Sequence, residues 1–136
     1  MRLVLDTNVV ISAFIKPDSK PSHVLKIALG HKAELCYNSA ILGEYESVML
    51  RPKFSSKIDT NNIRRFIDLI RSIGFPFHPP PSNIKLPDES DRIFYDTAKK
   101  SGSVLISGNI KHFPQETFII SPADFLKKFE YQKNSM

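Results

Sequence analysis

The chain has 136 residues, of which 41% are hydrophobic and 24% charged, with a net charge of +5. These values are typical of one globular domain with a sizeable core, and we expect it at 1–130 with a frayed tail at 131–136. No run of about 18 apolar residues occurs, which excludes a membrane-spanning helix and a membrane partner. Cys36 is the only cysteine, so no internal disulfide can form and a cytoplasmic location is expected.

Short apolar runs alternate with amphipathic runs along most of the chain. The pattern predicts strands at 2–5, 33–37, 75–78, 103–107 and 117–120. It predicts helices at 8–15, 23–29, 39–51, 60–73, 90–100 and 122–130, with Ser22 and Ser39 as N-caps of the second and third. This alternation indicates an α/β fold with a mainly parallel sheet covered by helices on both faces.

An acid, Asp6, stands where the first apolar strand ends. A carboxylate at the edge of a core is costly unless something pairs with it, although Asp6 could also cap the following helix. In open parallel sheets the functional site lies at the carboxyl ends of the strands. Ser107 and Asn109 follow a later predicted strand, so we expect them at the same edge as Asp6.

Two further acids are candidates to meet Asp6. Glu44 lies early in the third predicted helix, on the side expected to face away from Val48, and Asp91 lies in the first turn of the helix at 90–100. Asp88 could cap that last helix or join the acids. Converging carboxylates share protons or hold a cation, and Mg²⁺ or Mn²⁺ suits such oxygen ligands. The alternatives are a solvated helix residue for Glu44 and a helix-dipole partner for Asp91.

Four segments resemble the PIN-domain family in their order and spacing: LDTNVVISAF, EYESVMLRPKF, PDESDRIFYDTA and LISGNIKHFP. The likeness spans roughly 2–127 and is to the stand-alone, VapC-like proteins of bacterial toxin–antitoxin pairs. It implies a three-layer α/β/α sandwich around a mainly parallel sheet. It also implies a metal-dependent ribonuclease, with RNA, a small antitoxin protein and a second copy of the chain as partners.

The resemblance also assigns the site. Asp6, Glu44 and Asp91 match the first three acids of the family, which implies that they bind Mg²⁺ or Mn²⁺ and act in catalysis. The fourth acid is replaced here by Asn109, which follows Ser107 and Gly108. Asn109 can still coordinate or orient water together with Ser107, but the site is one negative charge short.

Substrate contacts are expected from two pairs of residues. The first pair is Thr7 and Asn8, which match polar positions that support the acids in the family. Arg64 and Arg65, on the outer face of the helix at 60–73, could contact the RNA backbone, the alternative being a solvated helix face. His112 could touch the phosphate but is expected to be structural.

Two other functions remain open. A PIN fold that binds RNA or protein without cleaving it is favoured by Asn109, which removes a charge from the acids. A phosphotransferase with Asp6 as nucleophile is disfavoured, because Asn8 stands where that class places a second aspartate. A stabilising effect of Mn²⁺ separates a metal site from a module without one.

Overall fold

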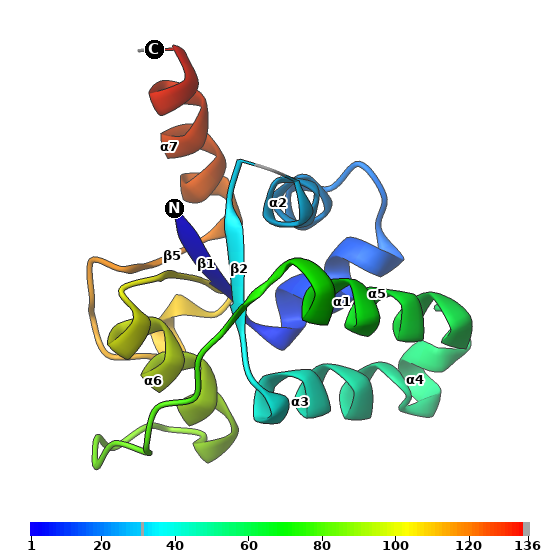
Figure 1. Cartoon of the computed structure of the whole chain (residues 1–136), viewed down its shortest axis with the longest axis horizontal. Coiled ribbons are helices and arrows are strands. Elements are labelled where there is room, and N and C mark those ends of the chain that lie inside the picture. Colours follow the sequence, from blue (N-terminus) through cyan, green and yellow to red (C-terminus); the bar gives the residue numbers. More distant parts are fainter. Residues whose placement is uncertain (31, 135–136) are drawn as a thin grey trace.

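The computed structural model describes residues 1–30 and 32–134. Strands form one sheet in the order β3-β2-β1-β4-β5, and every neighbouring pair is parallel. Their bounds are β1 (Arg2–Leu5), β2 (Glu34–Tyr37), β3 (Phe75–Pro76), β4 (Val104–Ile106) and β5 (Ile119–Ile120). Helix α6 (Arg92–Ser101) lies on one side of the sheet, whereas α1 (Thr7–Ile15), α2 (Lys20–Leu29) and α5 (Thr60–Ile73) lie on the other (Figure 1). The predicted three-layer α/β/α fold is confirmed.

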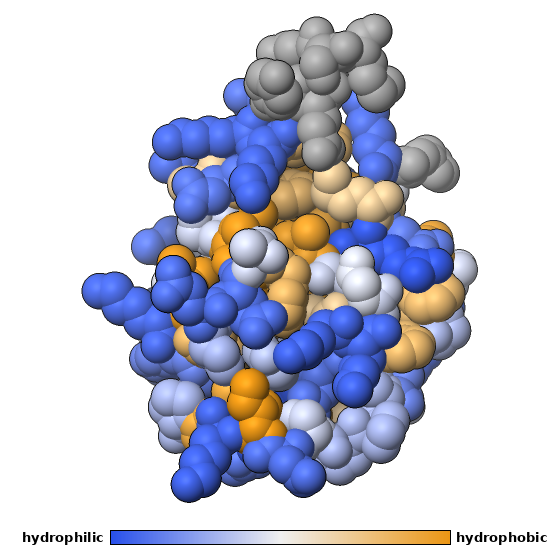
Figure 2. All heavy atoms as spheres, turned by 90° about the vertical axis from the view of Figure 1, so that its left-hand side faces the viewer, coloured by the Kyte–Doolittle hydropathy of each residue, from blue (hydrophilic) through white to orange (hydrophobic). Residues whose placement is uncertain are grey.

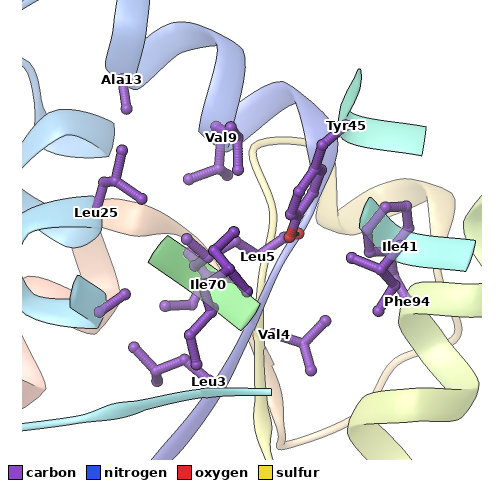
Figure 3. Close-up of a cluster of buried hydrophobic side chains, with 14 of the residues drawn as sticks. Leu3, Val4, Leu5, Val9, Ala13, Leu25, Ile41, Tyr45, Ile70 and Phe94 are labelled. Carbon is purple, nitrogen blue, oxygen red and sulfur yellow. Dashed lines mark hydrogen bonds between the residues drawn. The ribbon is translucent and has the colours of Figure 1, made fainter. Parts of the chain in front are cut away.

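The central strand β1 is covered on both faces, which explains its unbroken apolar sequence. Leu3 and Leu5 point to one side, toward Ile70 of α5, and Val4 points to the other, toward Phe94 of α6 (Figure 3). All three strand residues are fully buried. Because successive side chains of a strand alternate between its faces, an apolar residue is needed at each position.

Two helices begin differently from the prediction. Helix α2 begins at Lys20, and its N-cap is Ser19, whose hydroxyl accepts a hydrogen bond from the Ser22 amide at 3.2 Å. Pro21 stands in the first turn of α2, where the missing N–H of proline costs nothing. Helix α3 (Ser39–Met49) is capped by Asn38 instead of Ser39. In both cases the cap lies upstream of the predicted serine.

The remaining helices require smaller corrections. A short helix α4 (Pro52–Ser55), which the sequence did not predict, follows α3. One turn, η1 (Glu89–Asp91), precedes α6, and another, η2 (Ile110–His112), follows β4. Helix α7 (Pro122–Asn134) continues past 130, so residues 131–134 are helical and the frayed tail predicted from 131 is wrong for them. Residues 135–136 lie outside the described part of the chain.

The proline-rich segment between β3 and η1 is fastened to α6. The Arg92 guanidinium donates hydrogen bonds to the carbonyl oxygens of Ser82 at 2.9 Å and Ile84 at 2.6 Å, and it pairs with Glu89 at 2.6 Å. The buried Asp96 accepts a 2.9 Å hydrogen bond from the Ser82 amide. These contacts hold the segment that leads into η1 and therefore fix where its acids lie.

The surface on the α6 side is mostly hydrophilic, with hydrophobic residues showing in separate places between the polar ones (Figure 2). Hydrophobic residues exposed between polar ones in this way are ordinary for a protein surface. Within residues 1–30 and 32–134, no helix combines the length and apolar character that crossing a membrane requires.

Candidate active site

A pocket of about 400 Å³ lies where β1 and β4 end, and four acids line it. Asp6 follows β1, Glu44 belongs to α3, Asp88 precedes the turn η1, and Asp91 is the last residue of that turn. Asn109, which follows β4, lines the same pocket. The fold therefore brings together three acids from sequence positions far apart, together with Asp88, around one opening.

Asp6 is the most deeply buried acid of the pocket, with 5% of its surface exposed. Its backbone amide donates to the Ile106 carbonyl at 3.0 Å, which ties the end of β1 to β4. Its carboxylate accepts a 2.7 Å hydrogen bond from the Ser107 hydroxyl. Burial raises the pKa of Asp6, and the Ser107 hydrogen bond partly opposes that rise. Asp6 occupies the N-cap position of α1, where its side chain accepts no capping hydrogen bond.

Ser107 connects Asp6 to the loop after β4. Its fully buried hydroxyl accepts a hydrogen bond from the Asn109 amide at 3.0 Å and donates its own proton to Asp6. The accepted bond therefore leaves the hydroxyl proton directed at the carboxylate. The exposed side chain of Asn109 lies at the pocket.

Helix α3 is anchored beside Asp6 by its tyrosine. The hydroxyl of the buried Tyr45 donates to the carbonyl of Leu5, immediately before Asp6. Glu44, the next residue back, is half-buried and lines the pocket together with Val48. The expectation that Glu44 faces away from Val48 is wrong, because residues four apart share one face of a helix.

Asp91 shows the electrostatic effect of the gathered acids. Burial raises the pKa of Asp91 to about 6, and the negative charges of Asp6 and Asp88 add to the rise. Asp88 itself accepts a 2.9 Å hydrogen bond from the Ser90 amide, which lowers its pKa. Asp88 thus caps η1 instead of α6, whose N-cap position is Asp91, and it also lines the pocket.

The polar residues predicted to contact substrate fall into two groups. Thr7 and Asn8 line the pocket, and the buried Thr7 Oγ1 has no hydrogen-bond partner among the described residues. Arg64 and Arg65 lie exposed on α5 and are not among the residues that line the pocket. His112 lines it instead, although we expected a structural role for that residue.

Sequence reasoning missed two lining residues. They are Arg51 and Ser90, neither of which was among the predicted site residues. The signal for Ser90 was available, because the Asp-x-Ser spacing in PDES is typical of a turn that caps the following helix.

These donors match a hard divalent cation in kind, since carboxylate oxygens surround the pocket and the Thr7 hydroxyl oxygen has no partner. Their arrangement is open: over residues 1–30 and 32–134, no three His, Cys, Asp or Glu side chains are grouped so that they could hold a metal ion as they stand. Glu44 and Asp91 are only half-buried.

Three comparisons place the chain among known proteins. A family model described as a PIN domain matches residues 2–111. An uncharacterized protein of Methanocaldococcus jannaschii, MJ1680, is 28% identical over 110 residues, which cover 80% of this chain and 71% of that protein. The fold is similar to a chain in the crystal structure of VapBC2 from Rickettsia felis bound to a DNA fragment from their promoter, with a TM-score of 0.56, 17% identity and coverage of 89% of this chain and 97% of that one. Because the family model spans well over half of its length, the chain belongs to the PIN-domain family, whose members are generally nucleases that use divalent metal ions.

Proposed function

We propose that the protein is a Mg²⁺- or Mn²⁺-dependent endoribonuclease that hydrolyses phosphodiester bonds of RNA. The observation that carries the proposal is the gathering of Asp6, Glu44 and Asp91 around one pocket, with Asp6 held by Ser107. Burial raises the pKa of Asp6, and burial together with the charges of Asp6 and Asp88 raises the pKa of Asp91 to about 6, so the ionised forms of both carboxyls are disfavoured. A site that keeps such acids together is one in which a cation offsets their charge.

The residues have distinct roles in this proposal. Asp6, Glu44 and Asp91 hold the cation, and Ser107 holds the Asp6 carboxylate in one orientation. A bound Mg²⁺ or Mn²⁺ would polarise a phosphate oxygen and lower the pKa of water at the site. Asn109 orients the attacking water, and the fully buried Ser107 acts only through Asp6 and the Asn109 amide. Thr7 and Asn8 contact the RNA. We propose that residues 1–130 act as one domain, since strands from Arg2 to Ile120 share a single sheet.

The first experiment is cleavage of a mixed RNA pool with Mn²⁺, Mg²⁺ or EDTA. We expect cleavage with either ion, no cleavage in EDTA, and loss of cleavage in Asp6→Asn and Glu44→Gln. The matched control is Glu46→Gln, which makes the same change at an exposed position of the same helix that does not line the pocket. Absence of cleavage by folded wild-type protein, or equal loss in Glu46→Gln, contradicts the proposal.

The second candidate is a PIN fold that binds RNA or protein without cutting, which the uncharged Asn109 favours. Wild-type protein and Asn109→Asp together distinguish the two functions. If wild type is a nuclease, Asn109→Asp alters the Mn²⁺ concentration needed for cleavage, but cleavage does not require the substitution. If wild type is a binding module without a metal site, it does not cleave RNA and gains no thermal stability from Mn²⁺. A protein whose folded state alone binds Mn²⁺ is stabilised by it.

We propose further that a small antitoxin protein blocks the acidic pocket, and that two copies of the chain form a homodimer in the cytoplasm. The fold likeness to a chain of VapBC2 supports the antitoxin, and the buried thiol of Cys36 is consistent with a reducing compartment. Expression should arrest growth, and co-expression of a small neighbouring reading frame should relieve the arrest. Light scattering of the purified protein tests the dimer. Normal growth on expression and a monomeric mass contradict these two points.

A further inference from the structure

Arg51 is the one arginine that lines the acidic pocket, and within the described residues its side chain makes no hydrogen bond or ion pair. It is exposed, and it lies among Asp6, Glu44, Asp88 and Asp91. A guanidinium that shares a pocket with four carboxylates, yet stays more than 4.0 Å from each, keeps its donors available for another anion.

The backbone of Arg51 is held firmly even though its side chain is free. Pro52 restricts the residue before it to extended backbone, and Arg51 has φ −62° and ψ 143°. Its amide donates to the Val48 carbonyl at 3.1 Å, and its own carbonyl accepts from the amides of Phe54 and Ser55 at 2.9 Å each. The junction of α3 and α4 thus presents Arg51 at a fixed place on the pocket rim.

The negative charge of the pocket is a reason to expect a positively charged side chain that binds the substrate. Four carboxylates repel a phosphodiester, and a cation held by some of them offsets only part of that repulsion. The planar fork of a guanidinium matches two oxygens of a phosphate group better than an ammonium does. A pocket of about 400 Å³ suits a ligand of nucleotide size, which requires the strand to be unpaired where it enters.

We propose that Arg51 holds a phosphate group of a single-stranded RNA substrate at the mouth of the acidic pocket. The proposal deepens the ribonuclease function and rests on it for the identity of the substrate. It makes Arg51 a substrate-binding residue that Asp6, Glu44 and Asp91 complement: the acids hold the cation and Arg51 holds the anion.

The test is binding of a fluorescein-labelled single-stranded RNA of ten nucleotides, measured by anisotropy at several salt concentrations. Binding is measured in EDTA, and also with Mn²⁺ in the Asp6→Asn background, where cleavage is not expected. Arg51→Ala should raise Kd about tenfold, as expected for loss of a charge-assisted hydrogen bond. It should also reduce the slope of log Kd against log salt by about 0.7, the value for one phosphate of a single strand. Arg51→Lys should recover part of the affinity, because it restores charge without the fork.

Lys128→Ala is the matched control, because it removes one exposed positive charge from α7, far from the carboxyl end of the sheet (Figure 1). It should leave Kd within about twofold of wild type. Wild-type affinity and salt slope in Arg51→Ala overturn the proposal, as does equal weakening by Lys128→Ala. Failure to bind the RNA both by wild type in EDTA and by Asp6→Asn with Mn²⁺ also overturns it.

Cleavage by the same proteins separates this proposal from the nuclease proposal. If wild type cleaves RNA, Arg51→Ala should raise KM about tenfold and change kcat far less. This is the result expected when a lost contact had bound the substrate and the transition state equally well. Binding that weakens in Arg51→Ala while wild type never cleaves supports the phosphate contact and contradicts the nuclease. Cleavage by Arg51→Ala with unchanged KM contradicts the contact and leaves the nuclease in place.

Discussion

The Ser107 hydroxyl donates a 2.7 Å hydrogen bond to the Asp6 carboxylate, although 101 residues of sequence separate them. The contact exists because β1 and β4 are paired in parallel, with Leu5 opposite Ile106, so the residues that follow both strands meet at one edge. The same hydroxyl accepts from the Asn109 amide. The buried Ser107 therefore connects Asp6, the first predicted acid, to the loop that carries Asn109, which stands at the position of the fourth acid.

Ser107→Ala should weaken both stability and metal binding. Removing the hydroxyl leaves the buried Asp6 carboxylate without its donor and should cost about 1–3 kcal/mol of unfolding free energy. If Asp6 binds a cation, loss of this supporting contact should lower Mn²⁺ affinity at least about tenfold, measured by calorimetry. Ser103→Ala is the control, because it removes another buried hydroxyl, bonded to Ser101 at 2.6 Å, from the opposite end of β4. Equal Mn²⁺ affinity in both variants contradicts the assigned role of Ser107.

Asp91→Asn should raise thermal stability in EDTA at pH 7.5. The pKa of Asp91 in the folded protein is raised from 3.8 to about 6, so the folded state favours the protonated carboxyl. That contribution is fully present below pH 3.8 and is lost as pH rises through about 6, which leaves the charged carboxyl destabilising at neutral pH. After allowance for solvent screening, the gain from asparagine is about 1 kcal/mol, or about 3 °C in Tm.

Two further conditions check the Asp91 prediction. At pH 4 the Tm values of wild type and Asp91→Asn should nearly coincide, because both then carry little charge at this position. In excess Mn²⁺ the order should reverse, since the cation stabilises only a protein that binds it. An Asp91→Asn variant that is less stable than wild type in EDTA at pH 7.5 would show that Asp91 is not repelled by its neighbours.

Arg92→Ala should loosen the proline-rich segment without removing any acid from the pocket. Arg92 holds the carbonyl oxygens of Ser82 and Ile84 and pairs with Glu89, so its loss frees the segment that leads to Asp88. We expect faster amide hydrogen exchange over residues 79–89 and weaker Mn²⁺ binding. Arg71→Ala is the control, because it removes an arginine whose 3.7 Å pair with Asp68 is exposed. Unchanged exchange over 79–89 contradicts this prediction.

Two glycine substitutions should have opposite effects on stability. A Cβ at Gly74 would lie 2.7 Å from the Ile70 carbonyl oxygen and 2.8 Å from that of Leu35, so Gly74→Ala should cost about 1–3 kcal/mol. A Cβ at Gly43 in α3 meets no atom within 4 Å. Gly43→Ala should therefore add about 0.5–1 kcal/mol through helix propensity. Urea denaturation measures both, and a stable Gly74→Ala would show that the end of α5 can shift away from β2.

Much of the fold could be predicted from the sequence, because it depends on local patterns. The apolar run at 2–5 predicted β1, and the spacing of Ile63, Phe66, Ile67 and Ile70 predicted α5. The errors lie at helix ends, as at Ser19 and Asn38, where several neighbouring residues can cap equally well and the tertiary contacts decide. Helix α4 was missed because Pro52 was read as the end of a helix, when it also begins the next one.

The sequence, through its resemblance to the PIN-domain family, supplied the residues that we propose for the chemistry: Asp6, Glu44 and Asp91, and Asn109 in place of a fourth acid. Strand alternation with helices also placed Asp6 and Ser107 at one edge, since parallel strands end together. Only the tertiary structure decided which other side chains share that edge. Arg51, Asp88 and His112 line the pocket, whereas Arg64 and Arg65 do not. The physical reason is that exposed polar residues follow no hydrophobic period, so their positions depend on how distant helices and loops pack around the ends of the strands.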